Sequence, residues 1–141
     1  MKTNSDVISK VIDFIEEHLT DEEELDLAKI ADIASYSKFH LHRIFSQIVG
    51  CTMHQYIQRR RLTEAARQLV YTDKSIIDIA SISGYETQQS FTLAFKRFYQ
   101  ESPQVYRKRK DFWPKQLKFE QQRIERTSYS NLNMRCEVKA A

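Results

Sequence analysis

The sequence predicts an all-α fold of two helix-turn-helix subdomains joined by a long linker helix, about seven helices in all, with a short irregular or strand-like C-terminal tail. The chain has only 2 Gly and 2 Pro in 141 residues, which favours helices joined by short turns over a sheet. Apolar residues recur at helical spacing along most of it. Ile30–Tyr36 is echoed 49 residues later by Ile79–Tyr85. Each copy is followed by a second helical stretch, which is the layout of a helix-turn-helix.

An amphipathic segment precedes the first copy. Residues 6–19 have apolar side chains at helical spacing, and the acidic residues 20–24 indicate a loop. Ser37 is a credible N-cap for the second helix of the motif, and Gly50 is a credible end. We therefore expect helices over residues 6–19, 27–34 and 38–49.

A long helix leads into the second copy. Thr52 can cap it, and Ser75 can cap the short helix that follows. We expect helices over residues 52–70, 76–82 and about 87–99, with a last short turn at 103–107. Gly84 lies at the second turn, where it permits the left-handed backbone that Ser35 must adopt at greater cost if the two turns match.

The chain is accordingly divided into a first subdomain (1–50), a linker helix (51–71), a second subdomain (72–110) and a tail (111–141). Within the tail, apolar residues from Leu132 to Val138 alternate with polar ones, as in a strand. A lone strand has no partner in a helical body. We therefore expect the tail to be weakly ordered or paired with another chain.

Charge is distributed unevenly along the chain, whose net charge is +3. Residues 1–35 hold 3 Lys and 10 Asp or Glu, a net charge of −7, whereas residues 36–141 hold 19 Lys or Arg and 9 Asp or Glu, a net charge of +10. This division suits a protein that turns one surface toward a polyanion. No apolar run approaches the roughly 18 residues that span a bilayer, and no secretion signal is recognisable. We expect a cytoplasmic, nucleoid-associated protein with no membrane partner.

Catalytic and metal sites are not indicated. The sequence has no nucleophile–base signature and no glycine-rich phosphate loop. Its four histidines and Cys51 lack partners at metal-ligand spacing. We therefore expect no enzymatic activity, no metal and no cofactor.

The exposed face of each second helix carries side chains that can read bases in a DNA major groove. Arg can bond guanine O6 and N7, Gln can bond adenine N6 and N7, and Phe or the Thr methyl group can touch a thymine methyl. The predicted base-contacting residues are Phe39, His42, Arg43, Gln88, Gln89 and Thr92. Hydroxyls, helix N-termini and basic side chains nearby should bind phosphates. The candidates are Ser37, Lys38, Arg59, Arg60, Arg61 and Lys96, although a solvated helix face explains the arginine triplet equally well.

The linker helix sets the spacing of the two reading helices. About 19 residues span about 28 Å at a rise of 1.5 Å per residue. With flanking loops, the two helices can sit one duplex turn apart, roughly 34 Å. One chain would then enter two successive major grooves as a monomer, and its sites would be asymmetric and about 20 base pairs long.

The residues that carry both motifs resemble the AraC-type transcription activators over roughly residues 7–108. The matching positions include Leu27-Ala28, Ile30-Ala31, Tyr36-Ser37, Leu41, Arg43, Phe45, Gly50, Tyr56-Ile57, Ile79-Ala80, Gly84-Tyr85, Phe91, Phe95-Lys96, Ser102-Pro103 and Tyr106-Arg107. Ser37–Arg43 and Gln88–Thr92 are most similar to the MarA, SoxS and Rob group. The resemblance implies a monomeric reader of double-stranded promoter DNA that recruits RNA polymerase, with regulated genes in drug efflux and stress tolerance.

Two positions depart from that group. Phe39 stands where the group usually has Trp, which keeps an apolar contact. Leu93 stands where it usually has Arg, and Leu cannot make a bidentate guanine contact. The second helix is therefore predicted to read sequence less stringently, by about 1–3 kcal/mol.

Two stretches of the tail, Arg123–Arg126 and Asn131–Glu137, resemble the closing strand of the effector-binding domain in Rob-like members. Some thirty residues cannot enclose a ligand pocket, so no small-molecule effector is expected. Activity would instead follow the amount of protein made.

Two other functions remain open. A protein-interaction co-regulator or antagonist could keep this fold while binding DNA weakly or non-specifically. A non-specific nucleoid protein would show the same salt dependence of binding but no preference for any sequence.

Overall fold

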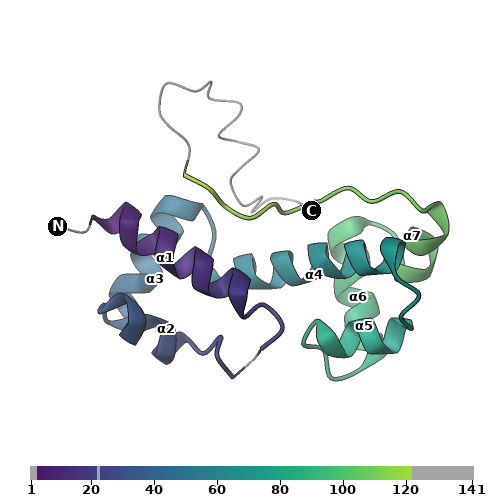
Figure 1. Ribbon diagram of the computed structural model, residues 1–141, viewed down its shortest axis with the longest axis horizontal. Coiled ribbons are helices and arrows are strands. Elements are labelled where there is room, and N and C mark those ends of the chain that lie inside the picture. The colour runs from purple at the N-terminus through teal and green to yellow at the C-terminus, as the bar shows by residue number, and fades with distance from the viewer. Residues whose placement is uncertain (1–2, 22, 122–141) are drawn as a thin grey trace. The chain divides into compact units, whose positions relative to one another are not determined.

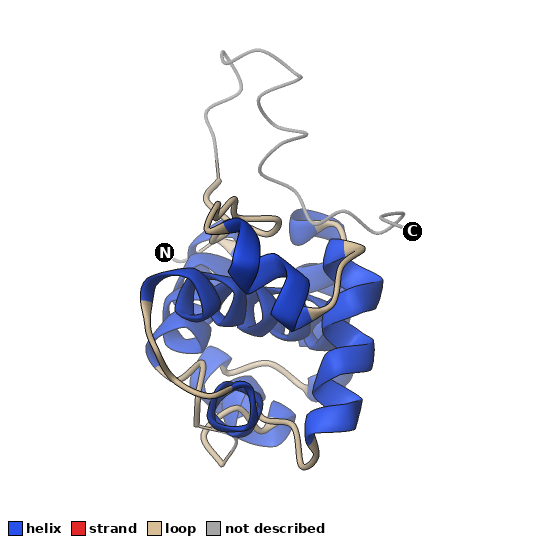
Figure 2. Cartoon of the chain, turned by 90° about the vertical axis from the view of Figure 1, so that its right-hand side faces the viewer, coloured by secondary structure: helices blue, strands red, loops and turns tan. Residues whose placement is uncertain are grey.

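The structure is a computed structural model that describes residues 3–21 and 23–121 (Figure 1). These residues form helices and no strand (Figure 2), which confirms the all-α prediction. The helices are α1 (Asn4–Glu17), α2 (Leu27–Ala34), α3 (Lys38–Val49), α4 (Met53–Tyr71), α5 (Ile76–Ile82), α6 (Gln88–Tyr99) and α7 (Pro103–Arg109). Among the described residues, no helix is both long and apolar enough to cross a membrane.

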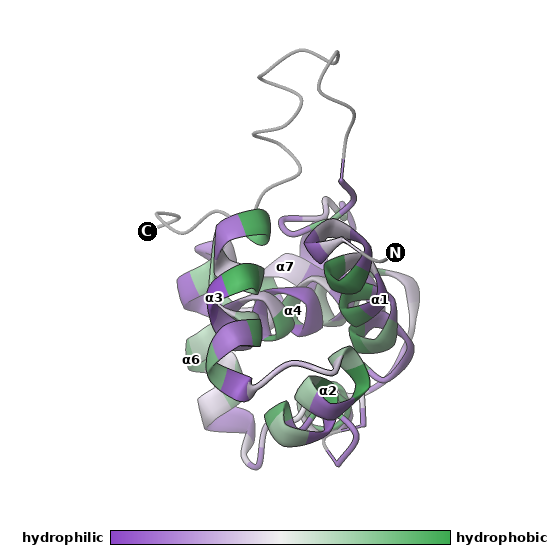
Figure 3. Cartoon of the chain, turned by 90° about the vertical axis from the view of Figure 1, so that its left-hand side faces the viewer, coloured by the Kyte–Doolittle hydropathy of each residue, from purple (hydrophilic) through white to green (hydrophobic). Residues whose placement is uncertain are grey.

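The described residues fall into two compact units. The first contains the chain up to Ile57 together with Lys118–Gln121, and the second contains Gln58–Leu117. In the first unit, α1, α2 and α3 enclose a core of aliphatic and aromatic side chains. Figure 3 shows hydrophobic and hydrophilic residues alternating along α1 and α2, as expected of helices that bury one face. The α1 helix begins earlier than predicted because Thr3 and Asp6 form a reciprocal capping box.

The turns of the two motifs have the same backbone geometry. The N–H of Tyr36 donates to the carbonyl oxygen of Ala31 at 3.1 Å, and the N–H of Tyr85 donates to that of Ala80 at 3.0 Å. Each hydrogen bond closes a loop of six residues. Such bonds are typical of helix ends at which one residue has left-handed backbone angles. That residue is Ser35, with φ of 60°, in the first turn and Gly84, with φ of 87°, in the second. The two turns therefore match, and Ser35 adopts the left-handed conformation that such a match requires.

Beyond the turns, equivalent residues lie 50 rather than 49 residues apart, and the helix caps repeat at this offset of 50. Ser37 Oγ accepts from the N–H of His40 at 3.1 Å, and Thr87 Oγ1 accepts from the N–H of Ser90 at 3.0 Å. These bonds satisfy N–H groups that no helical carbonyl reaches, so they fix where α3 and α6 begin. Ser75 caps α5 in the same way, as predicted.

The next pair of caps explains the helices that follow. Thr52 caps α4 by accepting from the N–H of Gln55 at 3.0 Å, as predicted. Its repeat partner Ser102 accepts from the N–H of Val105 at 3.2 Å. Because of this cap and Pro103 in the first turn, α7 is a full short helix through Arg109 rather than only a turn.

The aromatic cores repeat as well. Phe45 and Tyr56 pack edge to face in the first unit, with ring centroids 5.8 Å apart, and Phe95 and Tyr106 do so in the second at 5.4 Å. All four side chains are fully buried. Such pairs add about 0.5–1.5 kcal/mol to the burial of their area. The repeat in sequence is therefore a repeat in packing.

Residues 111–121 differ from the weakly ordered tail that we predicted. They contain no strand, and their backbone forms hydrogen bonds with buried side chains. The N–H of Trp113 donates to Tyr106 Oη at 3.1 Å, and the N–H of Lys115 donates to Tyr99 Oη at 3.1 Å. Phe119 adds its ring to the core of the first unit. Burial raises the pKa of both Tyr99 and Tyr106, so these hydroxyls remain protonated. The predicted strand at 132–138 lies outside the described residues.

Candidate nucleic-acid interface

One face of α3 is open to solvent while the other fills the core. Leu41, Ile44 and Phe45 are buried, because they lie at helical spacing on the side that meets α1 and α2. The predicted base-contacting residues Phe39, His42 and Arg43 are all exposed on this helix. Phe39 is 81% exposed. An aromatic ring left in water, beside a cation, is the type of side chain that a macromolecular partner covers.

A chain of side-chain contacts fixes Arg43. Its Nη2 donates to His40 Nδ1 at 3.2 Å, and the imidazole of His40 lies against the ring of Tyr36 with centroids 4.5 Å apart. Tyr36 in turn donates through its hydroxyl to Asn4 Oδ1. Sequence reasoning missed His40, although its spacing of three residues from Arg43 puts both on one helical face.

The N-terminus of α3 supplies groups that suit a phosphate. Ser37 and Lys38, both predicted to contact the DNA backbone, are exposed there. The first N–H groups of a helix carry partial positive charge, and the ammonium group of Lys38 adds a full one. This arrangement is able to bind an anion close to the exposed face of α3.

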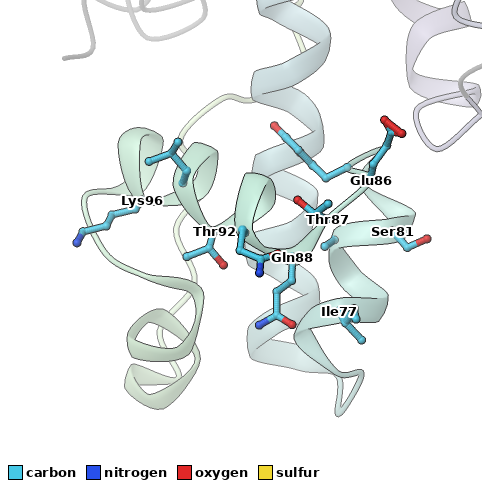
Figure 4. A pocket seen from close by; sticks show the side chains of 11 residues that line it. Ile77, Ser81, Glu86, Thr87, Gln88, Thr92 and Lys96 are labelled. Carbon is cyan, nitrogen blue, oxygen red and sulfur yellow. The ribbon is translucent and has the colours of Figure 1, made fainter.

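The exposed face of α6 borders a pocket of about 960 Å³. Its lining includes the predicted base-contacting residues Gln88, Gln89 and Thr92 and the predicted phosphate ligand Lys96. Figure 4 shows Gln88, Thr92 and Lys96 around this pocket together with side chains from α5. The structure thus brings all four predicted residues of α6 to one surface of the second unit.

Residues of α5 and the turn complete the pocket, and sequence reasoning did not select them. Ile77 and Ser81 of α5 are among its lining residues (both are labelled in Figure 4), and Tyr85 lines it from the turn. Burial raises the pKa of Tyr85, although the positive charge of Arg61 opposes this effect. The phenol is therefore neutral at physiological pH. Ile77 could have been recognised from the sequence, because an isoleucine on the polar face of a short amphipathic helix does not serve the core.

The arginine triplet of α4 does not form one surface. Arg60 is buried, donates to the carbonyl oxygen of Gln116 at 2.7 Å and pairs with Glu64 at 3.2 Å. Arg59 is half-buried, with its guanidinium carbon 6.0 Å from the ring centroid of Phe98. Arg61 is also half-buried. Consecutive residues point about 100° apart on a helix, so three in a row cannot share one face. The prediction that Arg60 contacts the DNA backbone does not fit its burial, and we leave Arg60 out of the proposed interface.

The fold and these two surfaces define the class of the protein: a DNA-binding module with two helix-turn-helix motifs. A family model described as "Helix-turn-helix domain" matches residues 30–109. The chain belongs to this family, of the AraC type, and is a DNA-binding regulator of transcription rather than an enzyme.

Three known proteins illustrate the relationship. "Uncharacterized HTH-type transcriptional regulator YbfP" of Bacillus subtilis (strain 168) is 45% identical over 100 residues, which are 71% of this chain and 33% of that protein. This chain therefore spans a third of that relative. "Multiple antibiotic resistance protein MarA" of Escherichia coli (strain K12) is 36% identical over 105 residues, 74% of this chain and 81% of MarA.

The third comparison is with a solved structure. The DNA-binding domain of AdpA, described as a global transcriptional factor and solved with a target DNA, is similar with a TM-score of 0.66 and 25% identity. The similarity covers 72% of this chain and 90% of that chain. A domain of similar fold has thus been solved in complex with a target DNA.

Proposed function

We propose that the protein activates transcription by binding asymmetric promoter sites as a monomer, with α3 and α6 in adjacent major grooves. The observation that carries the proposal is the repeated pattern of exposure. Phe39 of α3 and Gln89 of α6 are both exposed and lie 50 residues apart, and so do Arg43 and Leu93, on motifs whose turns and caps match. Two equivalent reading helices in one chain favour a site with two unlike halves.

The chemistry of the side chains indicates which residues of each motif contact bases and which contact phosphates. Arg43 and Gln89 carry planar groups that can bond a guanine and an adenine edge, while Phe39 and Thr92 offer apolar contacts to thymine. Ser37, Lys38 and Lys96 lie beside these side chains and suit phosphates. Arg59 and Arg61 are half-buried and remain weaker candidates for phosphate contacts.

The protein is proposed to recruit RNA polymerase and to regulate stress or drug-efflux genes. The support is its relationship to MarA, whose name records multiple antibiotic resistance. A protein that works on the chromosome would act in the cytoplasm, at the nucleoid. No small-molecule effector is part of the proposal.

Selection from a random duplex library, followed by gel shifts across a salt series, tests the proposal. We expect one protein per duplex, a preferred site of about 20 base pairs without a two-fold axis, and a log–log salt slope of about −0.9 for each phosphate neutralised. A palindromic site bound by two chains would contradict the monomeric mode.

The same selection separates the alternatives. A steep salt slope with no enriched sequence would identify a non-specific nucleoid protein. Weak binding under all salt conditions would favour the co-regulator or antagonist. Transcription from a promoter that carries the selected site, with purified RNA polymerase and with or without the protein, tests activation directly.

A further inference from the structure

Leu93 is the apolar side chain among the otherwise polar residues with which α6 lines the pocket. It lies on α6 at the position that the offset of 50 assigns to Arg43 of α3, and it is 53% exposed. Gln89 lies one turn before it on the same face and Lys96 one turn after it, and all three line the pocket described above. An exposed leucine in this place cannot replace the hydrogen bonds of an arginine.

A second apolar side chain faces the same pocket. Ile77 of α5 is 59% exposed, and Figure 4 shows it at the side of the pocket formed by α5. Thr92 contributes a methyl group from α6. The reading surface of the second unit therefore contains an apolar wall, whereas the corresponding position of the first unit carries a guanidinium.

Only one group in a major groove matches such a wall. The edges of guanine, cytosine and adenine present hydrogen-bond donors and acceptors, while thymine adds the C5-methyl group. Gln88 and Gln89 beside the wall can bond base edges, and Lys96 at its margin can approach a phosphate. These neighbours fit duplex DNA better than they fit an apolar protein surface.

We infer that Leu93 reads the methyl group of a thymine in the second half-site, at the base position where Arg43 reads guanine in the first. The inference rests on the proposed function and specifies one base of its target. It also gives a new interpretation of Leu93, which stands where the related group usually has Arg. The second helix then prefers a different base at this position, rather than having only a weaker preference.

Deoxyuridine provides a test at the level of one methyl group. In the selected duplex, each thymine of the site is replaced singly by deoxyuridine, which leaves pairing unchanged and removes only the C5-methyl. One replacement should weaken binding about fourfold, equivalent to about 0.8 kcal/mol for one buried methyl-sized group. Placing 5-methylcytosine there, paired with guanine, should bind more tightly than cytosine in the same pair.

The Leu93→Ala variant ties the effect to this residue. Because the side chain is half exposed, the substitution leaves the core intact, and an unchanged melting temperature checks this. The variant should bind the thymine and deoxyuridine duplexes equally well at that position. Leu117→Ala, at another exposed leucine outside the pocket, is the matched control and should keep the fourfold difference.

The outcomes separate the inference from the function on which it rests. If the wild type binds the selected site specifically but no deoxyuridine replacement weakens it, the inference is wrong and the proposed function stands. If Leu93→Ala keeps the full deoxyuridine penalty, another residue reads the methyl and the inference is again wrong. If no duplex is preferred over scrambled DNA, the proposed function itself fails.

Discussion

Ser35 and Gly84 lie 49 residues apart and end equivalent helices in the same left-handed conformation, with φ of 60° and 87°. A side chain with a Cβ costs roughly 1–2 kcal/mol in this region, and glycine avoids this cost. The two turns therefore have one geometry but different strain.

Substitutions at these two positions should have opposite effects on stability. Gly84→Ala should lower the free energy of unfolding by about 1–2 kcal/mol. Ser35→Gly should raise it by about 0.5 kcal/mol, because relief of strain exceeds the added freedom of the unfolded chain. Urea unfolding followed by circular dichroism measures both. A stabilising Gly84→Ala would mean that the second turn is not left-handed.

The hydroxyls of two repeat-related tyrosines hold the segment 111–121. Tyr56 Oη accepts from the buried N–H of Phe119 at 2.9 Å, and Tyr106 Oη accepts from that of Trp113. Tyr56→Phe leaves a buried donor without this acceptor and should cost about 1–3 kcal/mol of stability. Tyr106→Phe should cost about 1 kcal/mol, because its hydrogen bond with Trp113 is only partly buried. Tyr71→Phe removes an exposed hydroxyl and should change nothing; an equal loss in all three variants would refute the assignment.

Arg43 and His40 should behave as one unit in DNA recognition. Arg43→Ala should remove about 1–3 kcal/mol of preference for guanine at one position of the first half-site. His40→Phe keeps a ring beside Tyr36 but loses the acceptor for Arg43, and should remove about 0.5–1.5 kcal/mol of the same preference.

A base-substitution scan in a double-mutant cycle measures this coupling. In the Arg43→Ala background, His40→Phe should have no further effect on the guanine preference. The control is His54→Phe, an exposed histidine on α4. Additive losses from Arg43→Ala and His40→Phe would show that His40 does not act through Arg43.

Lys96 and Arg97 are consecutive cations with different predicted roles. Both are exposed in the last turn of α6, but only Lys96 lines the pocket. Lys96→Ala should weaken binding to all sequences alike and make the salt slope shallower by about 1. Arg97→Ala should leave the slope unchanged. A change in base preference in the Lys96→Ala variant would contradict a phosphate contact.

Local signals made most of the fold predictable. Ser37, Thr52 and Ser75 were recognisable as caps because the bonds they form reach only three residues along the chain. The left-handed turn at Gly84 was predictable for the same reason. Its equivalence with Ser35 followed from the repeat, which compares distant residues without knowledge of their contacts.

The missed features depend on distant partners or on orientation. The burial of Arg60 depends on Gln116, 56 residues away, and no local pattern announces that contact. The order of residues 111–121 likewise depends on Tyr56, Tyr99 and Tyr106. The orientation of Arg43 by His40 could have been anticipated from spacing alone.

A missing-base interference assay on the selected duplex tests the central claim most directly. Single bases are removed one at a time, and the positions whose loss prevents binding are mapped. We predict two clusters of such positions about one helical turn apart, on one face of the duplex, in a complex with one protein chain. A single cluster, or two symmetric clusters that require two chains, would contradict the claim that α3 and α6 read adjacent grooves together.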